Sequence, residues 1–259
     1  MTNVMHVESG VSSSAGQKRS RNEDFSVADN ALGLFLVIDG MGGHARGDVA
    51  SQIVGESITK FVADTARDHD KTWPFEFDPR LSYNANRMKA AVGMANIHLA
   101  QRIHEDEQLR GMGATMAGAL VDGDCAVISN VGDCRTYLIR DGAIQQLTSD
   151  HSWVAEQVRS GLIKQGDAKR HPLRNLVTRA VSGGDEQVDV DVREMPVQAN
   201  DRLLVCSDGL HGLLSDDDLL EHVNAHADNP QAACDALVAL ANERGAPDNV
   251  TVVIVQVSP

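Results

Sequence analysis

The stretch LFLVIDGMGGHARGD (residues 34–48) raises the question on which the fold and the function both depend. Five apolar residues are followed by Asp39 and Gly40, then by a glycine-rich turn and the start of a helical pattern. A short apolar run that ends at a turn predicts a buried strand. A carboxylate at the end of such a strand is costly to bury unless hydrogen bonds or cations compensate its charge. The sequence therefore indicates that Asp39 has a partner, either hydrogen-bond donors or cations, that compensates its charge.

A second stretch, RLLVCSDGLHG (residues 202–212), repeats this pattern. Its apolar run also ends in an aspartate and a glycine, Asp208 and Gly209, and also leads into a helical pattern. Two further Asp-Gly pairs, at 122–123 and 141–142, have strand-like segments on both sides, which predicts two-residue hairpin turns. The hairpin explanation therefore accounts for two of the four pairs and leaves the other two unexplained.

Further acidic residues stand at the boundaries of predicted strands. Glu23 and Asp24 stand at a strand entrance with Arg19 shortly before them, Asp133 lies in a break between two strands, and Asp248 precedes the last strand. Mn²⁺ and Mg²⁺ prefer oxygen ligands of this kind, and a glycine after an aspartate lets a backbone carbonyl or a phosphate approach closely. A turn or a helix cap explains each acid alone, but the whole set indicates a two-metal carboxylate site.

The composition limits the classes of protein to which the chain can belong. With 259 residues, of which 42% are hydrophobic, it has the size of one large domain or two small ones. Its 23 Lys and Arg against 37 Asp and Glu give a net charge of −14. That charge argues against a nucleic-acid-binding protein and repels phosphorylated substrates. Such a substrate would therefore need local positive charge from an Arg or from metal ions.

Three observations predict a cytoplasmic protein without membrane contact. No apolar run approaches the roughly 18 residues of a membrane span. The start MTNVMHVESG lacks the basic and apolar regions of a signal peptide. The four cysteines show no C-x-x-C pairing, and reduced core cysteines are typical of the cytosol.

The order of the predicted elements favours an α+β fold. Helices are predicted at 48–62, 82–106, 216–226 and 230–243, and strands at 33–38, 113–121, 124–131, 134–140, 143–147, 186–195, 201–206 and 249–257. Asn229, Pro230 and Gly245 mark the ends of the last helix. Because strands and helix pairs are segregated rather than strictly alternating, a layered sandwich is favoured over a doubly wound parallel sheet.

Seven motifs follow one another in an informative order: RSRNED (19–24), DGMGGH (39–44), GMGATM (111–116), NVGDCRTYL (130–138), HPLRNLVTRAVS (171–182), SDGL (207–210) and PDNVT (247–251). Together they resemble the metal-dependent PPM, or PP2C-like, serine/threonine protein phosphatases in their bacterial form, over about residues 6–257. The resemblance implies a single PP2C-like phosphatase domain over residues 1–259. The implied fold is a four-layer α-β-β-α sandwich of two antiparallel sheets flanked by helices, with a flap segment at about 152–180.

The resemblance also implies two bridging Mn²⁺ or Mg²⁺ ions at one end of the sandwich. Carried over by position, Asp39 would bridge both ions and Gly40 would offer its carbonyl oxygen. Asp208 and Asp248 would hold one ion, and Glu23 would reach the other through water. Asp39, Asp208 and Asp248 are thus the expected catalytic metal ligands.

Further roles follow from the same resemblance. Asp133 matches the ligand of a third, weaker ion, Asp24 takes a supporting role, and Arg19 grips the substrate phosphate. In family members with DGHGG, a histidine after Asp-Gly is a candidate general acid; here that position is Met41. His44 comes later in the motif and is either the general acid or a histidine that packs at a helix entry.

The third-ion site departs from the family pattern in one place. Gly212 stands where many members have an aspartate four residues after the aspartate of the DG motif. Its neighbour His211 is either a weak substitute ligand or a surface histidine.

The expected activity is direct hydrolysis of phosphoserine or phosphothreonine. A hydroxide formed from metal-bridging water attacks the phosphoryl group in line, while the fork-shaped guanidinium of Arg19 positions the phosphate. By family analogy the substrates are phosphoproteins of a bacterial Ser/Thr kinase, or the kinase itself. We expect a monomer that binds neither nucleic acid nor membrane.

Several alternatives stay open at this point. The chain could be a catalytically weak PP2C-like scaffold that binds phosphoproteins, a metallophosphoesterase with histidine ligands, or a hydrolase of small phosphate esters. The basic residues of the segment at 152–180 either steer phosphopeptides or belong to a solvated loop; they are Arg159, Lys164, Lys169, Arg170 and Arg174.

Overall fold

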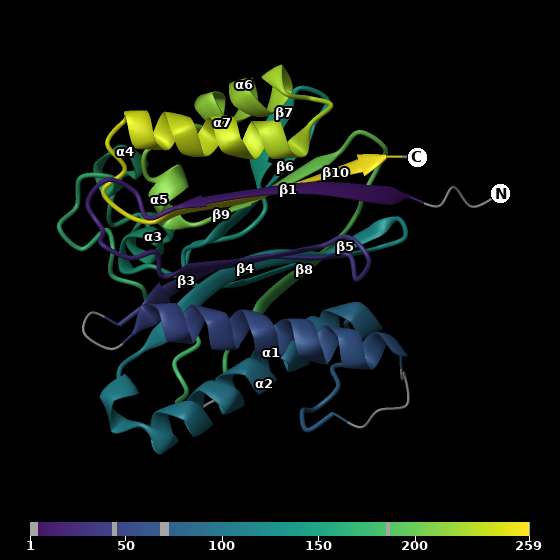
Figure 1. The fold of residues 1–259 in the computed structure, drawn as a ribbon, viewed down its shortest axis with the longest axis vertical. Helices are drawn as coiled ribbons and strands as arrows, with labels where there is room; N and C mark the ends of the chain where they lie inside the picture. Colours follow the sequence, from purple (N-terminus) through teal and green to yellow (C-terminus); the bar gives the residue numbers. More distant parts are fainter. Residues whose placement is uncertain (1–4, 43–45, 68–72, 185–186, 259) are drawn as a thin grey trace.

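Two five-stranded antiparallel sheets pack face to face, and helices cover both outer faces (Figure 1). The computed structural model describes residues 5–42, 46–67, 73–184 and 187–258. One sheet, called sheet 1 here, has the strand order β1-β10-β9-β6-β7, and sheet 2 has the order β2-β3-β4-β5-β8. The predicted four-layer α-β-β-α sandwich is therefore confirmed.

The strands and helices have the following bounds. Sheet 1 contains β1 (His6–Ser14), β10 (Val250–Ser258), β9 (Arg202–Cys206), β6 (Arg135–Arg140) and β7 (Ala143–Gln146). Sheet 2 contains β2 (Asp24–Asp29), β3 (Leu34–Met41), β4 (Gly113–Asp122), β5 (Cys125–Val131) and β8 (Asp191–Pro196). The helices are α1 (Gly47–Arg67), α2 (Tyr83–Glu105), η1 (Glu107–Leu109), α3 (Trp153–Arg159), α4 (Gln165–Ala168), α5 (Asp208–His211), α6 (Asp216–Ala225) and α7 (Pro230–Glu243).

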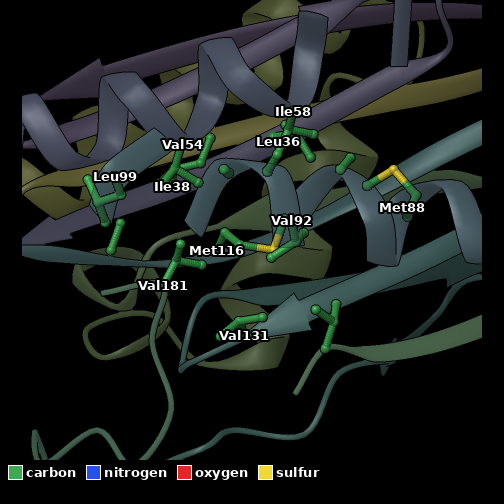
Figure 2. Close-up of a cluster of buried hydrophobic side chains, with 14 of the residues drawn as sticks. Leu36, Ile38, Val54, Ile58, Met88, Val92, Leu99, Met116, Val131 and Val181 are labelled. Atoms are coloured by element: carbon green, nitrogen blue, oxygen red, sulfur yellow. The ribbon is translucent and has the colours of Figure 1, made fainter. Parts of the chain in front are cut away.

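Alternation of side chains along β3 divides the core into layers. Leu36 and Ile38 belong to the cluster beneath α1 and α2, whereas Phe35 and Val37 belong to the core between the two sheets. Figure 2 shows Leu36 and Ile38 beside Val54 and Ile58. Because residues two apart in a strand share a face, the strand is apolar on both sides and forms a continuous hydrophobic run.

The helix ends follow the sequence signals. Asn229 caps α7 by accepting a hydrogen bond from Ala232 N, Pro230 opens the helix, and Gly245 follows it with a φ of +88°. Ser215 and Asp218 form a reciprocal capping box at the start of α6. The predicted boundaries of α7 are therefore confirmed.

Some boundaries differ from the predictions. β3 continues through Met41, so Asp39 lies inside the strand end rather than at its tip. The first hairpin turn consists of Gly123 and Asp124, because Asp122 pairs with Cys125 and remains in β4. Likewise β8 begins at Asp191 rather than at 186.

No strand is predicted at β1, because HVESGVSSS is rich in serine. This strand lies at the edge of sheet 1 and pairs with the apolar β10. Gln231 of α7 accepts a hydrogen bond from Val11 N and donates one to Val11 O, which satisfies backbone groups of β1. Tertiary pairing therefore stabilises a strand whose own sequence is polar.

The expected site residues lie where several strands begin or end. Cys206 at the end of β9 pairs with Val252 near the start of β10 and with Arg135 at the start of β6. Asp208, Asp248 and Asp133 flank these strands, so the antiparallel register brings them to one end of sheet 1. The short helices α3, α4 and α5 gather on the side of the molecule away from both termini (Figure 1).

The four cysteines are free, and three of them are buried. In the part of the chain that the structure describes, no helix combines the length and the hydrophobicity needed to cross a bilayer.

The packing of β3 against α1 makes Leu36 a test of the core. Leu36 is fully buried, so Leu36→Ala should lower the free energy of unfolding by about 2–5 kcal/mol, measured by urea denaturation. Lys60→Ala, on the exposed side of α1, should change it by no more than about 0.5 kcal/mol. Equal effects of the two substitutions would contradict this packing.

Candidate active site

Asp39 lies at the centre of a group of acidic side chains from distant parts of the chain. It pairs with Asp24 of β2 and with Thr115 of β4, and it shares the face of Phe35 and Val37, which points toward sheet 1. The negative charges of four other aspartates act on it: Asp24, Asp208, Asp133 and Asp248. The structure therefore brings the aspartates singled out in the sequence into one cluster between the sheets.

Burial and mutual repulsion make these carboxyls unusually weak acids in the metal-free protein. Burial, followed by the charge of Asp24, raises the pKa of Asp39 well above its ordinary value. Burial is also the largest cause for the three others, where it raises the pKa of Asp24 and of Asp133 to about 7 and that of Asp208 to about 6. The cluster thus concentrates negative charge that nothing nearby neutralises fully.

Two carboxylate oxygens in this cluster accept no hydrogen bond from the residues that the structure describes. They are the buried Oδ1 atoms of Asp24 and Asp208, whereas Ser207 Oγ donates a hydrogen bond to the other oxygen of Asp24 at 2.9 Å. A buried polar atom without a partner costs free energy. Unpaired, buried carboxylate oxygens are ligands that hard divalent cations prefer.

The glycines after the two aspartates make room for protein backbone. A Cβ atom on Gly40 would lie 2.1 Å from Gly47 O and 2.6 Å from Glu23 O, and one on Gly209 would lie 1.9 Å from Asn249 O. The prediction that a glycine after the aspartate lets a backbone carbonyl approach closely is therefore confirmed at both positions. Close approach of these carbonyl oxygens packs the segments that carry the acids against one another.

Glu23 lies beside the start of α1. Its backbone carbonyl accepts hydrogen bonds from Gly40 N at 3.1 Å and from Ser51 Oγ at 2.6 Å. Its carboxylate oxygen Oε2 lies 3.0 Å from the place where a Cβ on Gly47 would stand. Glu23 is therefore adjacent to Gly40, as the expected ligand set requires.

Arg19 lies at the rim of the cluster. Its Nη2 donates to Asp248 Oδ2 at 2.7 Å, and its side chain is 55% exposed. Its Nε and Nη1 groups bond to no other residue in the described part of the chain. The guanidinium therefore keeps donors for an incoming anion while one of its nitrogens holds a carboxylate.

Asp133 lies in the turn between β5 and β6, next to His211. His211 Nε2 donates to the backbone oxygen of Asp133 at 2.9 Å. Burial lowers the pKa of His211 to about 4, so the imidazole is neutral at physiological pH. His211 is therefore a half-buried histidine bonded to the turn that carries Asp133, and not a surface histidine. His44, the candidate general acid, lies outside the described residues.

Asn249 and His151 support the site and were not singled out in the sequence. Asn249 Oδ1 accepts from Glu23 N at 2.9 Å, and its Nδ2 donates to Arg21 O at 2.8 Å. This residue therefore ties the segment before β2 to the start of β10. The PDN motif contained this signal, because a polar residue directly follows the aspartate.

His151 holds the turn before Asp133. Gly132 N donates to its Nδ1 at 3.0 Å, while its Nε2 lies 3.1 Å from Asp191 Oδ2. It is 2% exposed. Nothing in the local sequence separates this buried histidine from a surface one, because all of its partners are remote.

The donor set fits hard divalent cations that keep part of their hydration shell. Across the described ranges, no three His, Cys, Asp or Glu side chains are gathered closely enough to hold an ion by themselves. Mg²⁺ commonly keeps several waters and binds through one or two carboxylates. The unpaired oxygens and the raised pKa values at Asp24 and Asp208 therefore suit ions that water and a backbone carbonyl help to coordinate.

Comparison with known proteins identifies the class. Residues 13–242 match the protein phosphatase 2C family. The serine/threonine phosphatase stp of Listeria monocytogenes is 33% identical over 249 residues, which cover 93% of this chain and 92% of the relative.

Solved structures agree. The serine/threonine phosphatase PstP/Ppp of Mycobacterium tuberculosis superposes with a TM-score of 0.85 at 32% identity, covering 98% of this chain and 100% of the other. The catalytic domain of the phosphatase PstP in complex with two manganese ions gives a TM-score of 0.82 at 32% identity, with the same coverage.

The chain belongs to the protein phosphatase 2C family. The predicted class, a metal-dependent serine/threonine protein phosphatase, is therefore confirmed. The expected pair of divalent ions agrees with the two manganese ions of the PstP structure.

The acidic cluster should make the stability of the metal-free protein depend on pH. A carboxyl with a raised folded-state pKa binds more protons in the folded than in the unfolded state, so its contribution to stability falls as pH rises. For Asp24 this window runs from its ordinary 3.8 to about 7. The lowered pKa of His211 acts in the opposite direction, so a variant of one carboxyl isolates its effect.

We therefore expect Asp39→Asn to become more stable than the wild type, in EDTA, as pH rises from 4 to 7, measured as Tm. Excess Mn²⁺ should reverse the order, because ligand at a hundredfold excess over Kd adds about 2.7 kcal/mol to the form that binds it. An Asp39→Asn protein that is less stable than the wild type in EDTA throughout this pH range would contradict the repulsion.

Proposed function

We propose that Asp39, Asp208 and Asp248, together with the carbonyl oxygen of Gly40 and the carboxylate of Glu23, form the metal site of a protein phosphatase. One observation carries this proposal: half-buried aspartates from three distant segments meet and repel one another, and two of their carboxylate oxygens are buried without a hydrogen bond from any described residue. Structural acids in a core are normally hydrogen-bonded or paired with cations. Divalent cations would offset the repulsion between the aspartates and would also bind the unpaired carboxylate oxygens.

When bound there, two Mn²⁺ or Mg²⁺ ions would supply a water of lowered pKa and would offset the charge of the phosphate. Asp39, Asp208 and Asp248 would hold these ions. Asp133 would serve a third, weaker ion, and His44 would protonate the leaving alkoxide.

The residues of this chain orient the substrate. Arg19 would bind the phosphate through guanidinium N–H groups that bond to no other described residue, because the donors along one edge of a planar guanidinium match two phosphate oxygens. Its ion pair with Asp248 holds the side chain at the rim. The pairing therefore fixes Arg19 before a substrate arrives, which reduces the entropy lost on binding.

We further propose that the chain acts as a single phosphatase domain and as a monomer in the cytoplasm. Its substrates would be phosphoserine and phosphothreonine proteins, including those of a bacterial Ser/Thr kinase. The names of the relatives, which are serine/threonine phosphatases, support the substrate class in this proposal.

Activity should depend on both the metal and Asp39. We expect Mn²⁺-dependent phosphate release from a phosphothreonine peptide, near-complete loss in EDTA, and a fall in kcat of about a thousandfold in Asp39→Asn, since metal-ion stabilisation is worth several kcal/mol. Asp141→Asn changes the same dipeptide in a hairpin turn and should leave kcat unaltered. Metal-independent turnover would refute the site. Metal binding without turnover would favour the phosphoprotein-binding scaffold.

Arg19 should contribute geometry as well as charge. Arg19→Lys keeps the charge and loses the fork, so kcat/KM for the phosphopeptide should fall by about ten- to a hundredfold, as expected for loss of a charged hydrogen bond. Inhibition by inorganic phosphate should weaken in parallel. If Arg19→Lys matches the wild type in both measurements, Arg19 does not bind the phosphate.

A further inference from the structure

A groove of about 730 Å³ adjoins the acidic cluster, because Asp133 and Asp208 are among the residues that line it. Most of its other lining residues belong to residues 152–180, called the flap segment here, and to the chain from α5 to the start of α6. A phosphorylated side chain at the acidic cluster would therefore place neighbouring residues of its own chain in this groove.

The flap segment gives the groove a positively charged wall. Arg159, Lys169 and Arg174 line it, and none of their side chains forms a hydrogen bond or an ion pair with another residue that the structure describes. By contrast, Arg135 in the same groove is neutralised by Asp150 at 2.7 Å. The flap wall therefore offers unpaired cations, whereas Arg135 does not.

The opposite wall carries Asp216 and Asp217. Both lie in the first turn of α6, where the positive end of the helix dipole offsets part of a carboxylate's charge. Three unpaired cations therefore face two partly compensated anions. The acidic wall repels an anionic segment and favours its placement against the flap.

The flap wall is held in place before a ligand binds. Trp153 stacks on His171 with ring centroids 5.0 Å apart, and Thr178 Oγ1 donates to Glu156 at 2.6 Å. Val154 is 4% exposed and anchors α3 to the interior. The backbone of a wall fixed in this way loses little conformational entropy when it binds a peptide, so the entropy cost falls mainly on the three exposed cationic side chains.

The net charge of the chain explains why local cations would help an anionic substrate to bind. At −14 the protein repels an anionic phosphopeptide as a whole. A local cationic wall beside the phosphate position reverses that effect at short range, where salt screens least.

We propose that this groove selects phosphopeptides that carry negative charge beside the phosphorylated residue, and that Arg159, Lys169 and Arg174 determine this specificity. The proposal rests on the phosphatase function proposed above. Carboxylate side chains and a second phosphate share the required chemistry, so the substrate class is anionic phosphopeptides of either kind.

The test compares phosphothreonine peptides of one length whose flanks carry Glu, Gln, Lys or a second phosphothreonine. With Mn²⁺, kcat/KM of the wild type for the Glu and the doubly phosphorylated peptides should exceed that for the Gln peptide by about tenfold, since exposed ion pairs contribute modestly and here add together. The preference should shrink at high salt. Comparing the Glu arm with the phosphate arm identifies which source binds better.

A matched pair of variants separates the groove from the overall field. Arg159→Glu with Lys169→Glu should abolish the preference for the Glu peptide over the Gln peptide. Lys164→Glu with Arg170→Glu makes the same change of charge in the same segment, outside the groove lining, and should preserve the preference. Thermal melts check that both proteins fold.

The outcomes are distinct. Metal-dependent turnover of all peptides without a flank preference would overturn the groove proposal and leave the phosphatase function intact. Equal loss of preference in both double variants would also overturn it, because the overall field would then be responsible. If no peptide were turned over in the presence of metal, the proposed function itself would fail.

Discussion

Repulsion among buried carboxylates is the constraint on which the rest of this structure depends. Burial disfavours the charge of Asp39, Asp24, Asp208 and Asp133, and the charges of neighbouring aspartates raise their pKa values further. A core normally excludes such groups or pairs them. Their retention means that folding energy from elsewhere in the sandwich offsets a local cost, a pattern typical of functional sites.

The apolar core between the two sheets offsets this cost, and the backbone packs closely at the ends of the sheets. Phe35 and Val37 of β3 lie in the inter-sheet core, and the same alternation directs Asp39 toward sheet 1. The absence of a side chain at Gly40 and at Gly209 lets the acid-bearing segments approach each other. Strand register and glycine packing thus set the spacing of the acids.

Much of this arrangement could be predicted from the sequence, because it depends on local patterns. Apolar runs that end in acids predicted the strands beside Asp39 and Asp208, and segregated helices and strands predicted the layers. The edge strand β1 could not be predicted with its partner, since its serine-rich sequence is stabilised by β10 and by Gln231. The roles of Asn249 and His151 were also missed, because their hydrogen bonds join segments far apart in the chain.

The charge distribution connects the site to its substrates. An acidic protein that hydrolyses phosphate esters must overcome its own field, and within the described residues the local cations near the cluster are of two kinds. Arg19 is paired with Asp248 at the rim of the acidic cluster, whereas Arg159 and Lys169 remain unpaired along the groove. The paired cation is suited to fix geometry at the reacting group, and the unpaired ones to attract charge at a distance from it. Catalysis and selection can therefore vary independently, because different residues carry them.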